Sequence, residues 1–211
     1  MFITFEGIEG SGKTTQLHRL AEFLRERGRT VVTTKEPGGT EIADRIRAIL
    51  LDSKNVIDPI AEVLLFAASR RQHTVEVIRP AHERGAVVLC DRYTDSTLAY
   101  QGFGRTLNLD QLRTLNRWAT GDLDPDLTLI FDLAESVGLS RAVHRNARAA
   151  DDEGRFEAED LRFHRRVREG YLSLAAAEPQ RYAVIDAGGT LDQVFERTLD
   201  TLRQRKPELF A

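Results

Sequence analysis

Short apolar runs alternate along this chain with longer segments in which apolar residues recur at helical spacing. The short runs are mostly apolar or β-branched, as expected for strands buried on both faces, and they span 2–5, 30–34, 86–90, 127–131 and 182–185. In the first longer segment, apolar residues recur from Leu17 to Leu24, and Gly28 follows as a stop signal. The alternation predicts an α/β fold, with a five-stranded parallel sheet and helices on both of its faces. Ligands of such sheets bind at the carboxyl ends of the strands.

A chain of 211 residues is long enough for one domain with a sizeable core, and no linker or internal repeat divides it. One segment differs from the rest. Residues 141–168 contain eight arginines, and the centre of that segment, 146–155, has alanine as its only apolar residue. We expect this centre to be a mobile polar loop between two helices, within a single domain over residues 1–211.

Charge and composition exclude several classes of protein. The formal net charge is -3, whereas binding to a nucleic-acid backbone needs a basic surface, so we expect no nucleic-acid partner. No stretch approaches the roughly 18 apolar residues that span a bilayer, and the first residues are typical of a strand rather than of a signal peptide. The single cysteine, Cys90, allows no intrachain disulfide. We therefore expect a cytoplasmic protein without membrane association.

The segment from Gly7 to Thr14 matches the pattern G-x-x-x-x-G-K-[ST] in full, between a predicted strand and a predicted helix. Its glycines let the backbone N–H groups point at phosphate oxygens, and the positive end of the following helix faces the same anion. Lys13 can reach the terminal phosphates, and the Thr14 hydroxyl can bind Mg²⁺. The alternative is a glycine-rich turn that only starts a helix. The pattern predicts an ATP site formed by Gly7, Ile8, Glu9, Gly10, Ser11, Gly12, Lys13 and Thr14.

A P-loop alone does not define the reaction, because GTP switches and motor ATPases share it. The guanine-reading sequence Asn-Lys-x-Asp is absent, and the Asp-x-x-Gly at 151–154 lies in the polar loop and follows no strand. The chain is also short for most motor modules. A small-molecule kinase is the simplest prediction, and the alternative from another class is a P-loop binding module without turnover.

A second polar cluster follows the third predicted strand. Asp91 ends this strand beside the P-loop, where it can hold Mg²⁺ directly or through water, and Arg92 can offer its guanidinium fork to a phosphate. The alternative is a solvated helix surface with a chance arginine. If a helix starts here, Arg92, Ser96 and Tyr100 lie on one polar face of it. Thr97 and Gln101 lie beside this face.

Two further pieces have suitable chemistry for a second substrate. Phe66 and Arg70 are four residues apart on a helix predicted to begin after Pro59, so a ring can stack on a base while the guanidinium bonds to it; the alternative is that Phe66 belongs to the core. The segment from Glu36 to Thr40 follows the second strand, and its two glycines allow close approach to a ligand. Thr40 can cap the next helix, so a purely structural turn is the alternative there.

Taken together, these residues resemble the bacterial thymidylate kinases, over residues 1 to about 200 and in the same order. The P-loop is generic, but its combination with the other motifs is specific to that family. The matching motifs are G-I-E-G-S-G-K-T-T at 7–15, E-P-G-G-T at 36–40, D-R-Y at 91–93, S-T-L-A-Y-Q-G at 96–102, P-D-L-T-L at 125–129 and G-L-S-R-A at 138–142.

The resemblance implies a three-layer P-loop kinase fold with a mobile lid at about 142–158. It implies transfer of the γ-phosphoryl group of ATP to dTMP, with Mg²⁺, in dTTP synthesis, by a homodimer. Another nucleoside monophosphate kinase is the nearest rival, against which Phe66, Arg70 and Tyr100 argue. The apolar run 61–68 is a candidate for the dimer interface, although a core role competes with it.

The resemblance also implies roles for site residues. Phe66 would stack on thymine and Arg70 would bond to it, while Thr97 would contact the base edge and Tyr100 would crowd the sugar 2′ position. The remaining substrate-binding candidates lie near these positions: Glu36, Pro37, Ser96 and Gln101.

The phosphates would be handled from several sides. Arg92 would hold the acceptor phosphate, and Glu9 would help to organise the sugar and that phosphate. Arg141, in G-L-S-R-A, would lie near the adenine, as would the loop from Ala187 to Gly189.

Some members of the family place a catalytic arginine in the P-loop, at the position of Gly10, and others supply it from the lid. Gly10 places this chain with the lid-arginine kind. We expect Arg155 to stabilise the transferred charge, with Arg145 and Arg148 as rivals.

Overall fold

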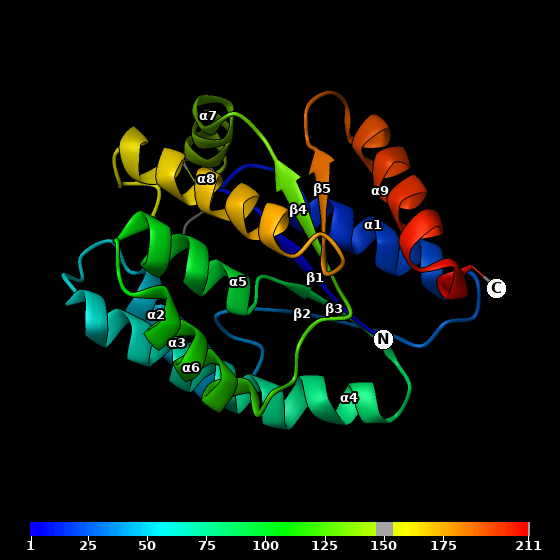
Figure 1. The fold of residues 1–211 in the computed structure, drawn as a ribbon, viewed down its shortest axis with the longest axis horizontal. Helices are drawn as coiled ribbons and strands as arrows, with labels where there is room; N and C mark the ends of the chain where they lie inside the picture. Colours follow the sequence, from blue (N-terminus) through cyan, green and yellow to red (C-terminus); the bar gives the residue numbers. More distant parts are fainter. Residues whose placement is uncertain (147–153, 211) are drawn as a thin grey trace.

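The computed structural model describes residues 1–146 and 154–210. A parallel sheet of five strands runs through its centre in the order β2-β3-β1-β4-β5 (Figure 1). Each strand begins and ends within one residue of its predicted run, which confirms the predicted sheet. The strands are β1 (Phe2–Glu6), β2 (Val31–Lys35), β3 (Val87–Asp91), β4 (Leu127–Asp132) and β5 (Tyr182–Asp186).

Helices cover both faces of this sheet (Figure 1). On one face, α1 (Lys13–Arg25) packs on β1, β2 and β3, and α9 (Leu191–Arg205) packs on β5. Two π-helical segments, η1 (Thr74–Ile78) and η2 (Leu98–Gly104), continue α3 and α5, and the 3-10 turn η3 (Pro207–Leu209) follows α9. The other face and its carboxyl edge carry α2 (Glu41–Leu51), α3 (Pro59–His73), α4 (Arg79–Glu83), α5 (Thr94–Thr97), α6 (Leu109–Thr120), α7 (Glu135–Asn146) and α8 (Leu161–Ala177).

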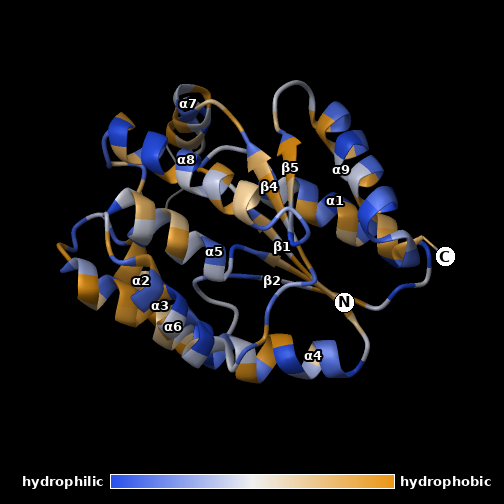
Figure 2. Ribbon diagram, in the orientation of Figure 1, coloured by the Kyte–Doolittle hydropathy of each residue, from blue (hydrophilic) through white to orange (hydrophobic). Residues whose placement is uncertain are grey.

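Alternate residues of the central strands supply two cores. Ile3 and Phe5 of β1 point toward Leu17 and Leu20 of α1, whereas Phe2 packs with Tyr93 on the opposite face. Both cores are dry because parallel strands are covered on each side, which explains their nearly continuous apolar runs. In Figure 2, β4 and β5 have the colour of hydrophobic residues, whereas the surrounding helices carry both hydrophobic and hydrophilic colours.

The helices that flank the site begin where the sequence predicts. Thr40 accepts a hydrogen bond from the Ala43 N–H at 3.2 Å, which confirms it as the cap of α2. Asp58 caps α3 by accepting from the Ile60 N–H at 2.9 Å, and Pro59 occupies the first helical position, where a missing N–H costs nothing. These caps fix the starts of the two helices whose inner ends line the site.

Candidate active site

A cavity of about 650 Å³ opens at the carboxyl ends of β1, β2 and β3. This is the edge at which a parallel sheet binds ligands. Sixteen of the residues singled out from the sequence line it. They are Glu9, Gly10, Gly12, Lys13, Thr14, Glu36, Pro37, Phe66, Arg70, Asp91, Arg92, Ser96, Thr97, Tyr100, Gln101 and Arg141.

The P-loop wraps one end of the cavity. Gly12 has a φ of 86° at the start of α1 and no side-chain cap, so the first N–H groups of the helix are left for a ligand. Burial, and then Arg92, lower the pKa of Lys13, and the carboxylates of Asp91 and Glu9 oppose that shift. The arrangement is a nest of backbone donors with one buried amine beside it, which suits the phosphates of a nucleotide.

Gly10 lies where the backbone of the P-loop meets the backbone of α7. Its φ is 69°, and a Cβ at this position would lie 2.8 Å from the Gly138 carbonyl carbon. In turn, a Cβ at Gly138 would lie 2.5 Å from the Glu9 carbonyl oxygen. Two glycines therefore let α7 approach the P-loop, and this contact brings Arg141 of the same helix to the cavity. A larger residue at Gly10 would push α7 away.

Thr14 and Asp91 form a pair of oxygen ligands beside Lys13. The Thr14 hydroxyl donates a short hydrogen bond to Asp91 Oδ2. Asp91 Oδ1 is buried, and no described residue bonds to it. A carboxyl oxygen without a hydrogen-bond partner, next to a hydroxyl and a phosphate cradle, fits a hard divalent cation, which prefers oxygen ligands.

Arg92 adopts a left-handed backbone conformation, with a φ of 69°. Helix α5 begins only at Thr94, so the expectation of a helix that starts at Arg92 is wrong. Hydrogen bonds on both sides hold the turn: the Arg92 N–H donates to Phe5 O at 3.0 Å, and the Tyr93 N–H donates to Glu6 Oε1 at 2.8 Å. The side chain of Arg92 is thereby aimed back over the end of β1.

The guanidinium of Arg92 is held by four side chains. Its Nη2 donates to Glu9 Oε1 at 2.9 Å and to the Tyr100 hydroxyl at 3.0 Å. Its Nη1 donates to Ser96 Oγ at 3.1 Å and to the Tyr171 hydroxyl at 3.2 Å. Arg92 is therefore no chance arginine on a solvated helix, but a fixed positive charge at the wall of the cavity.

Two carboxyls near Arg92 differ in charge. Burial raises the pKa of Glu9, but the cations Arg92 and Lys13, the nearby His164 ring and the hydrogen bond from Tyr100 outweigh it, so the pKa lies well below its ordinary value. Burial and the nearby Asp95 raise the pKa of Glu6 to about 7, against the opposing effect of Arg92. Glu9 is thus an ionised acceptor that faces the cavity, while Glu6 is part of the buried support beneath Arg92.

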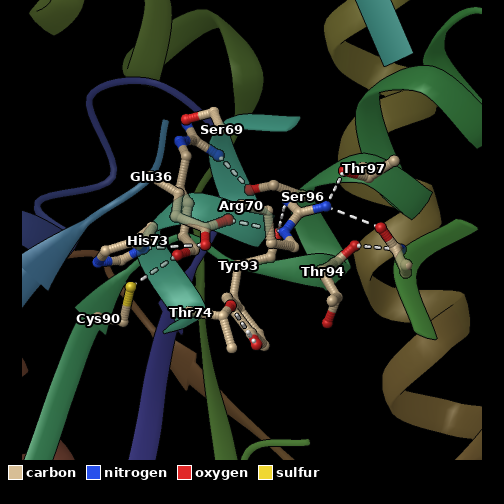
Figure 3. A network of polar contacts seen from close by, with 12 residues as sticks. Glu36, Ser69, Arg70, His73, Thr74, Cys90, Tyr93, Thr94, Ser96 and Thr97 are labelled. Carbon is tan, nitrogen blue, oxygen red and sulfur yellow. Dashed lines mark hydrogen bonds and ion pairs between the residues drawn. The ribbon is translucent and has the colours of Figure 1, made fainter. Parts of the chain in front are cut away.

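Arg70 lies at the opposite end of the cavity, in the network of Figure 3, and is 2% exposed. Its Nε donates to Glu36 Oε2 at 2.7 Å, and its Nη2 donates to Tyr93 O at 3.0 Å. Its Nη1 donates to the Thr97 hydroxyl at 2.9 Å and to Asn116 Oδ1 at 2.7 Å. Four of its five N–H bonds are thereby used, and one on Nη2 is left for a ligand.

A second layer orients Glu36. Its Oε1 lies 3.0 Å from His73 Nδ1 (Figure 3). On the other side of the ring, His73 Nε2 lies 2.6 Å from the Thr34 hydroxyl. Gly39 leaves room for the His73 ring in this series of contacts, because a Cβ at Gly39 would lie 2.7 Å from that ring. The segment after β2 is therefore a positioning element for Arg70 rather than a plain turn.

Phe66 is half-buried and reaches the cavity from α3. Its ring lies 6.2 Å from that of Phe156, which also lines the cavity, so the two rings are in contact and border an apolar part of the cavity, the slot beside Phe66. Phe66 also packs against the core formed by α2, η2 and α8. Phe66 therefore lies partly in the core and partly in the wall of the cavity.

The comparisons with known proteins agree with this geometry. The family model described as Thymidylate kinase matches residues 5–198. The thymidylate kinase of Geobacter sulfurreducens is 57% identical over 208 residues, which cover 98% of each chain. That of Syntrophotalea carbinolica is 57% identical over 198 residues, 93% of this chain and 92% of the relative. The crystal structure of thymidylate kinase from Ehrlichia chaffeensis superposes with a TM-score of 0.78 at 36% identity and covers 96% of this chain and 98% of that one.

This chain belongs to the thymidylate kinase family. It is thus a nucleoside monophosphate kinase, which phosphorylates dTMP to dTDP with ATP as the phosphate donor. The P-loop kinase fold predicted from the resemblance is confirmed by the parallel sheet and by the solved relative.

The structure places the predicted lid arginine of this family member away from the P-loop. Arg155 Nη2 lies 2.7 Å from Glu62 Oε2, close enough for an ion pair although no N–H is aimed at that oxygen, and its Nε donates to Leu50 O. Arg155 does not line the cavity, whereas Phe156 and Glu157 do. Of its two rivals, Arg148 and the side chain of Arg145 lie outside the described residues.

Several site residues have no signal in the sequence. Glu62 and Asn116 are polar residues on helices, a position that normally faces solvent, and His73 and His164 match no motif used here. All four are at most 5% exposed, and they act on the site through contacts with residues far away in the chain. Only their burial, which the fold decides, distinguishes them from surface residues.

Proposed function

We propose that the cavity binds ATP and dTMP side by side and transfers the γ-phosphoryl group between them. The observation that supports this most strongly is one cavity lined by both Lys13 of the P-loop and Arg92. Donor and acceptor phosphates can then meet in line between two fixed positive charges, which is the main requirement of phosphoryl transfer. Formation of dTDP from dTMP and ATP tests the reaction, and its absence would contradict the proposal.

On the donor side, backbone N–H groups of residues 7–14 surround the ATP phosphates, and Lys13 contacts the terminal ones. Arg141 lies beside the adenine, because α7 is docked on the P-loop through Gly10 and Gly138. Thr14 and Asp91 hold Mg²⁺, which when bound would neutralise charge on the β- and γ-phosphates.

On the acceptor side, Arg92 binds the phosphate of dTMP and Glu9 accepts hydrogen bonds from the sugar. Tyr100 supports this assignment, since its hydroxyl donates to Glu9 at 2.5 Å and thus stands at the sugar position. A ring at this place leaves no room for a 2′ hydroxyl, which favours deoxyribose. Ser96 holds Arg92 from behind by accepting a hydrogen bond from it.

The base lies in the slot beside Phe66, which stacks on it. Arg70 donates its remaining N–H to a base carbonyl, and Thr97, already fixed by Arg70, borders the same edge. Gln101 contacts the base as well, and Glu36 with Pro37 closes the wall next to Arg70.

We propose that Arg155 supplies the catalytic lid charge after it leaves Glu62. The Arg155→Ala variant should then have a kcat lower by about 10²-fold or more and a dTMP dissociation constant changed less than about threefold, because the interaction is made only in the transition state. Single-turnover rates and equilibrium binding of dTMP measure the two. Arg162→Ala, which removes an exposed arginine at the start of α8 that does not line the cavity, is the matched control. Unchanged turnover in Arg155→Ala would move the role to Arg145 or Arg148.

We propose a homodimer that buries the exposed face of α3 and η1. Ile60, Leu64 and Val75 are 55%, 54% and 45% exposed, and they recur at helical spacing on one side of this helix. Trp118 of α6, a helix that packs on α3, is 78% exposed. A second copy related by a twofold axis would cover this face with the same face.

Sedimentation equilibrium tests the dimer. The chain has a mass of 23.8 kDa, and we expect twice this value for the native protein. Leu64→Arg should shift the mass toward the monomer because it buries a charge in the interface, whereas Leu191→Arg, at a residue 55% exposed on α9, should not. A native monomer would contradict the proposal.

In the described part of the chain, every helix is too short or too polar to cross a bilayer. We propose a cytoplasmic location, because the lone cysteine, Cys90, is buried and free, as is usual in a reducing compartment. Recovery of the protein with the periplasmic fraction of cells would contradict it.

A further inference from the structure

Glu62 lies on α3 beneath the base slot and is fully buried. Its Oε1 accepts from Gln101 Nε2 at 2.8 Å and from Arg105 Nε at 2.7 Å. Its Oε2 accepts from Arg105 Nη2 at 3.0 Å and lies 2.7 Å from Arg155 Nη2. Both carboxyl oxygens therefore face donors only.

The charge of Glu62 is secured by these contacts. Burial raises the pKa of Glu62, but the hydrogen bonds from Arg105 and Gln101 and the charge of Arg105 outweigh it, so the pKa lies below its ordinary value. An ionised carboxylate only accepts hydrogen bonds. Gln101 must therefore present its NH₂ group to Glu62 and cannot present its carbonyl oxygen.

This leaves the Oε1 of Gln101 for the cavity. Gln101 is 1% exposed and lines the cavity from η2. Within residues 1–146 and 154–210 no hydrogen bond to its Oε1 is formed, and that atom is not sealed off from the cavity. The side chain thus offers an acceptor, and never a donor, to whatever lies in the slot beside Phe66.

We propose that Glu62 is a positioning residue that sets the base specificity of this enzyme through the amide of Gln101. The inference rests on the proposed placement of the base beside Phe66. Thymine has an N–H donor at N3, which an acceptor matches, whereas cytosine has a lone pair at N3, which an acceptor repels. A wrongly oriented amide would reverse this match, and glutamine without Glu62 has no preference between its two orientations.

Glu62→Gln is the variant that separates orientation from packing. While Arg155 is at Glu62, as in the structure, the new amide nitrogen would face two arginine nitrogens at the position of Oε2, but only Arg105 Nε and Gln101 at the position of Oε1. Because Gln101 can turn and Arg105 cannot change from donor to acceptor, the new NH₂ group takes the Oε1 position. Gln101 then presents its own NH₂ to the cavity.

The experiment compares kcat/KM for dTMP and for 5-methyl-dCMP, which differ in N3 and in the group at position 4. For Glu62→Gln we expect the preference for dTMP to fall by about 10-fold or more, mainly through a higher KM for dTMP. The reason is that the amide of Gln101 matches N3 of thymine in the native enzyme but N3 of cytosine in the variant. Glu159→Gln is the matched control. Glu159 is the other carboxylate on Arg105, at 2.9 Å, and in the described part of the chain it does not bond to Gln101, so this variant should keep the native preference.

The Gln101→Met background tests the route of the effect. If Glu62 acts through the amide, adding Glu62→Gln to Gln101→Met leaves the preference unchanged. An equal loss of preference with and without Gln101 would overturn the proposal, as would a native preference in Glu62→Gln. If Gln101→Met alone leaves the KM for dTMP unchanged, the placement of the base itself is wrong, which is a different failure.

Loss of a buried negative charge between two arginines can prevent folding. Thermal melting of each variant with dTMP and without it shows whether the variant is folded. If the Glu62→Gln variant is not folded, the double variant Glu62→Gln with Arg105→Gln restores the charge balance. The preference for dTMP over 5-methyl-dCMP is then compared between this double variant and Arg105→Gln alone. Native preference in a folded double variant would also overturn the proposal.

Discussion

The Lys13→Ala variant should lose phosphoryl transfer by a factor on the order of 10³ or more. Lys13 is 8% exposed and is the only lysine in the P-loop, at the start of α1 where the γ-phosphate is expected. In a cavity of this depth its charge is screened little by water, so no solvent cation replaces it. Rapid-quench measurement of dTDP formation under saturating ATP and dTMP gives the loss directly.

Two further variants make this result specific. Lys13→Met keeps the buried stem and should be about as inactive as Lys13→Ala, which separates the lost charge from a lost contact. Lys54→Ala, at an exposed residue in the loop after α2, should retain native activity. Turnover of Lys13→Ala within about tenfold of the native enzyme would show that the P-loop is not the site of transfer.

The Arg92→Gln variant should lower kcat/KM for dTMP by about 10³-fold, with a much smaller effect on the KM for ATP. Arg92 is the cation that the turn after β3 and the buried Glu6 hold over the acceptor side, so its loss removes the charge that faces the acceptor phosphate. It also leaves Glu9 as a partly buried carboxylate with one cation fewer. Steady-state kinetics with each substrate varied in turn separate the two sides.

The conservative variant and an outside control complete this test. Arg92→Lys should recover only a small part of the activity, because an ammonium cannot reach Glu9, Tyr100 and a phosphate with one fixed fork. Arg45→Gln removes an arginine from an exposed pair with Glu41 on α2 and should be neutral. A larger change in the KM for ATP than in that for dTMP would place Arg92 on the wrong side of the site.

Sheet and P-loop were predictable because their signals are local. Strands covered on both faces must be apolar throughout, so the five runs coincide with β1 to β5 within one residue. Thr40 marks the start of α2 through a bond that reaches only three residues along the chain, and Pro59 marks the start of α3 through its own fixed backbone angle. One glycine of the P-loop, Gly10, is needed for the close approach of α7.

The geometry around Arg92 was harder to predict from the sequence. A polar helical face was predicted from Arg92 onward, but the residue lies before α5 in a left-handed turn. The contacts with Ser96 and Tyr100 form nevertheless, because the turn and the π-helical segment η2 aim these side chains at one another. The turn depends on Glu6 and Phe5 of a different strand, and such support cannot be read from spacing within one segment.

Glu62 shows the same limit more strongly. Gln101 and Arg105 are 39 and 43 residues away from it, so a carboxylate that resembles any solvated helix residue becomes the centre of a buried network only in the folded chain. Arg70 was predicted as a residue that binds the base, but its fixation by Glu36 and Asn116 was not. The residues that we propose to contact ligands were thus easier to recognise in the sequence than the residues that position them.

The most direct test of the account measures ADP release with dTMP, dUMP, dCMP, dGMP and dAMP in turn, at one ATP concentration with Mg²⁺. The slot beside Phe66, the acceptor of Gln101 and the crowding by Tyr100 predict the highest kcat/KM for dTMP, and little or no activity with dCMP and the two purine nucleotides. Equal rates across the five monophosphates, or a preference for any of them over dTMP, would contradict the assignment of this cavity to thymidylate.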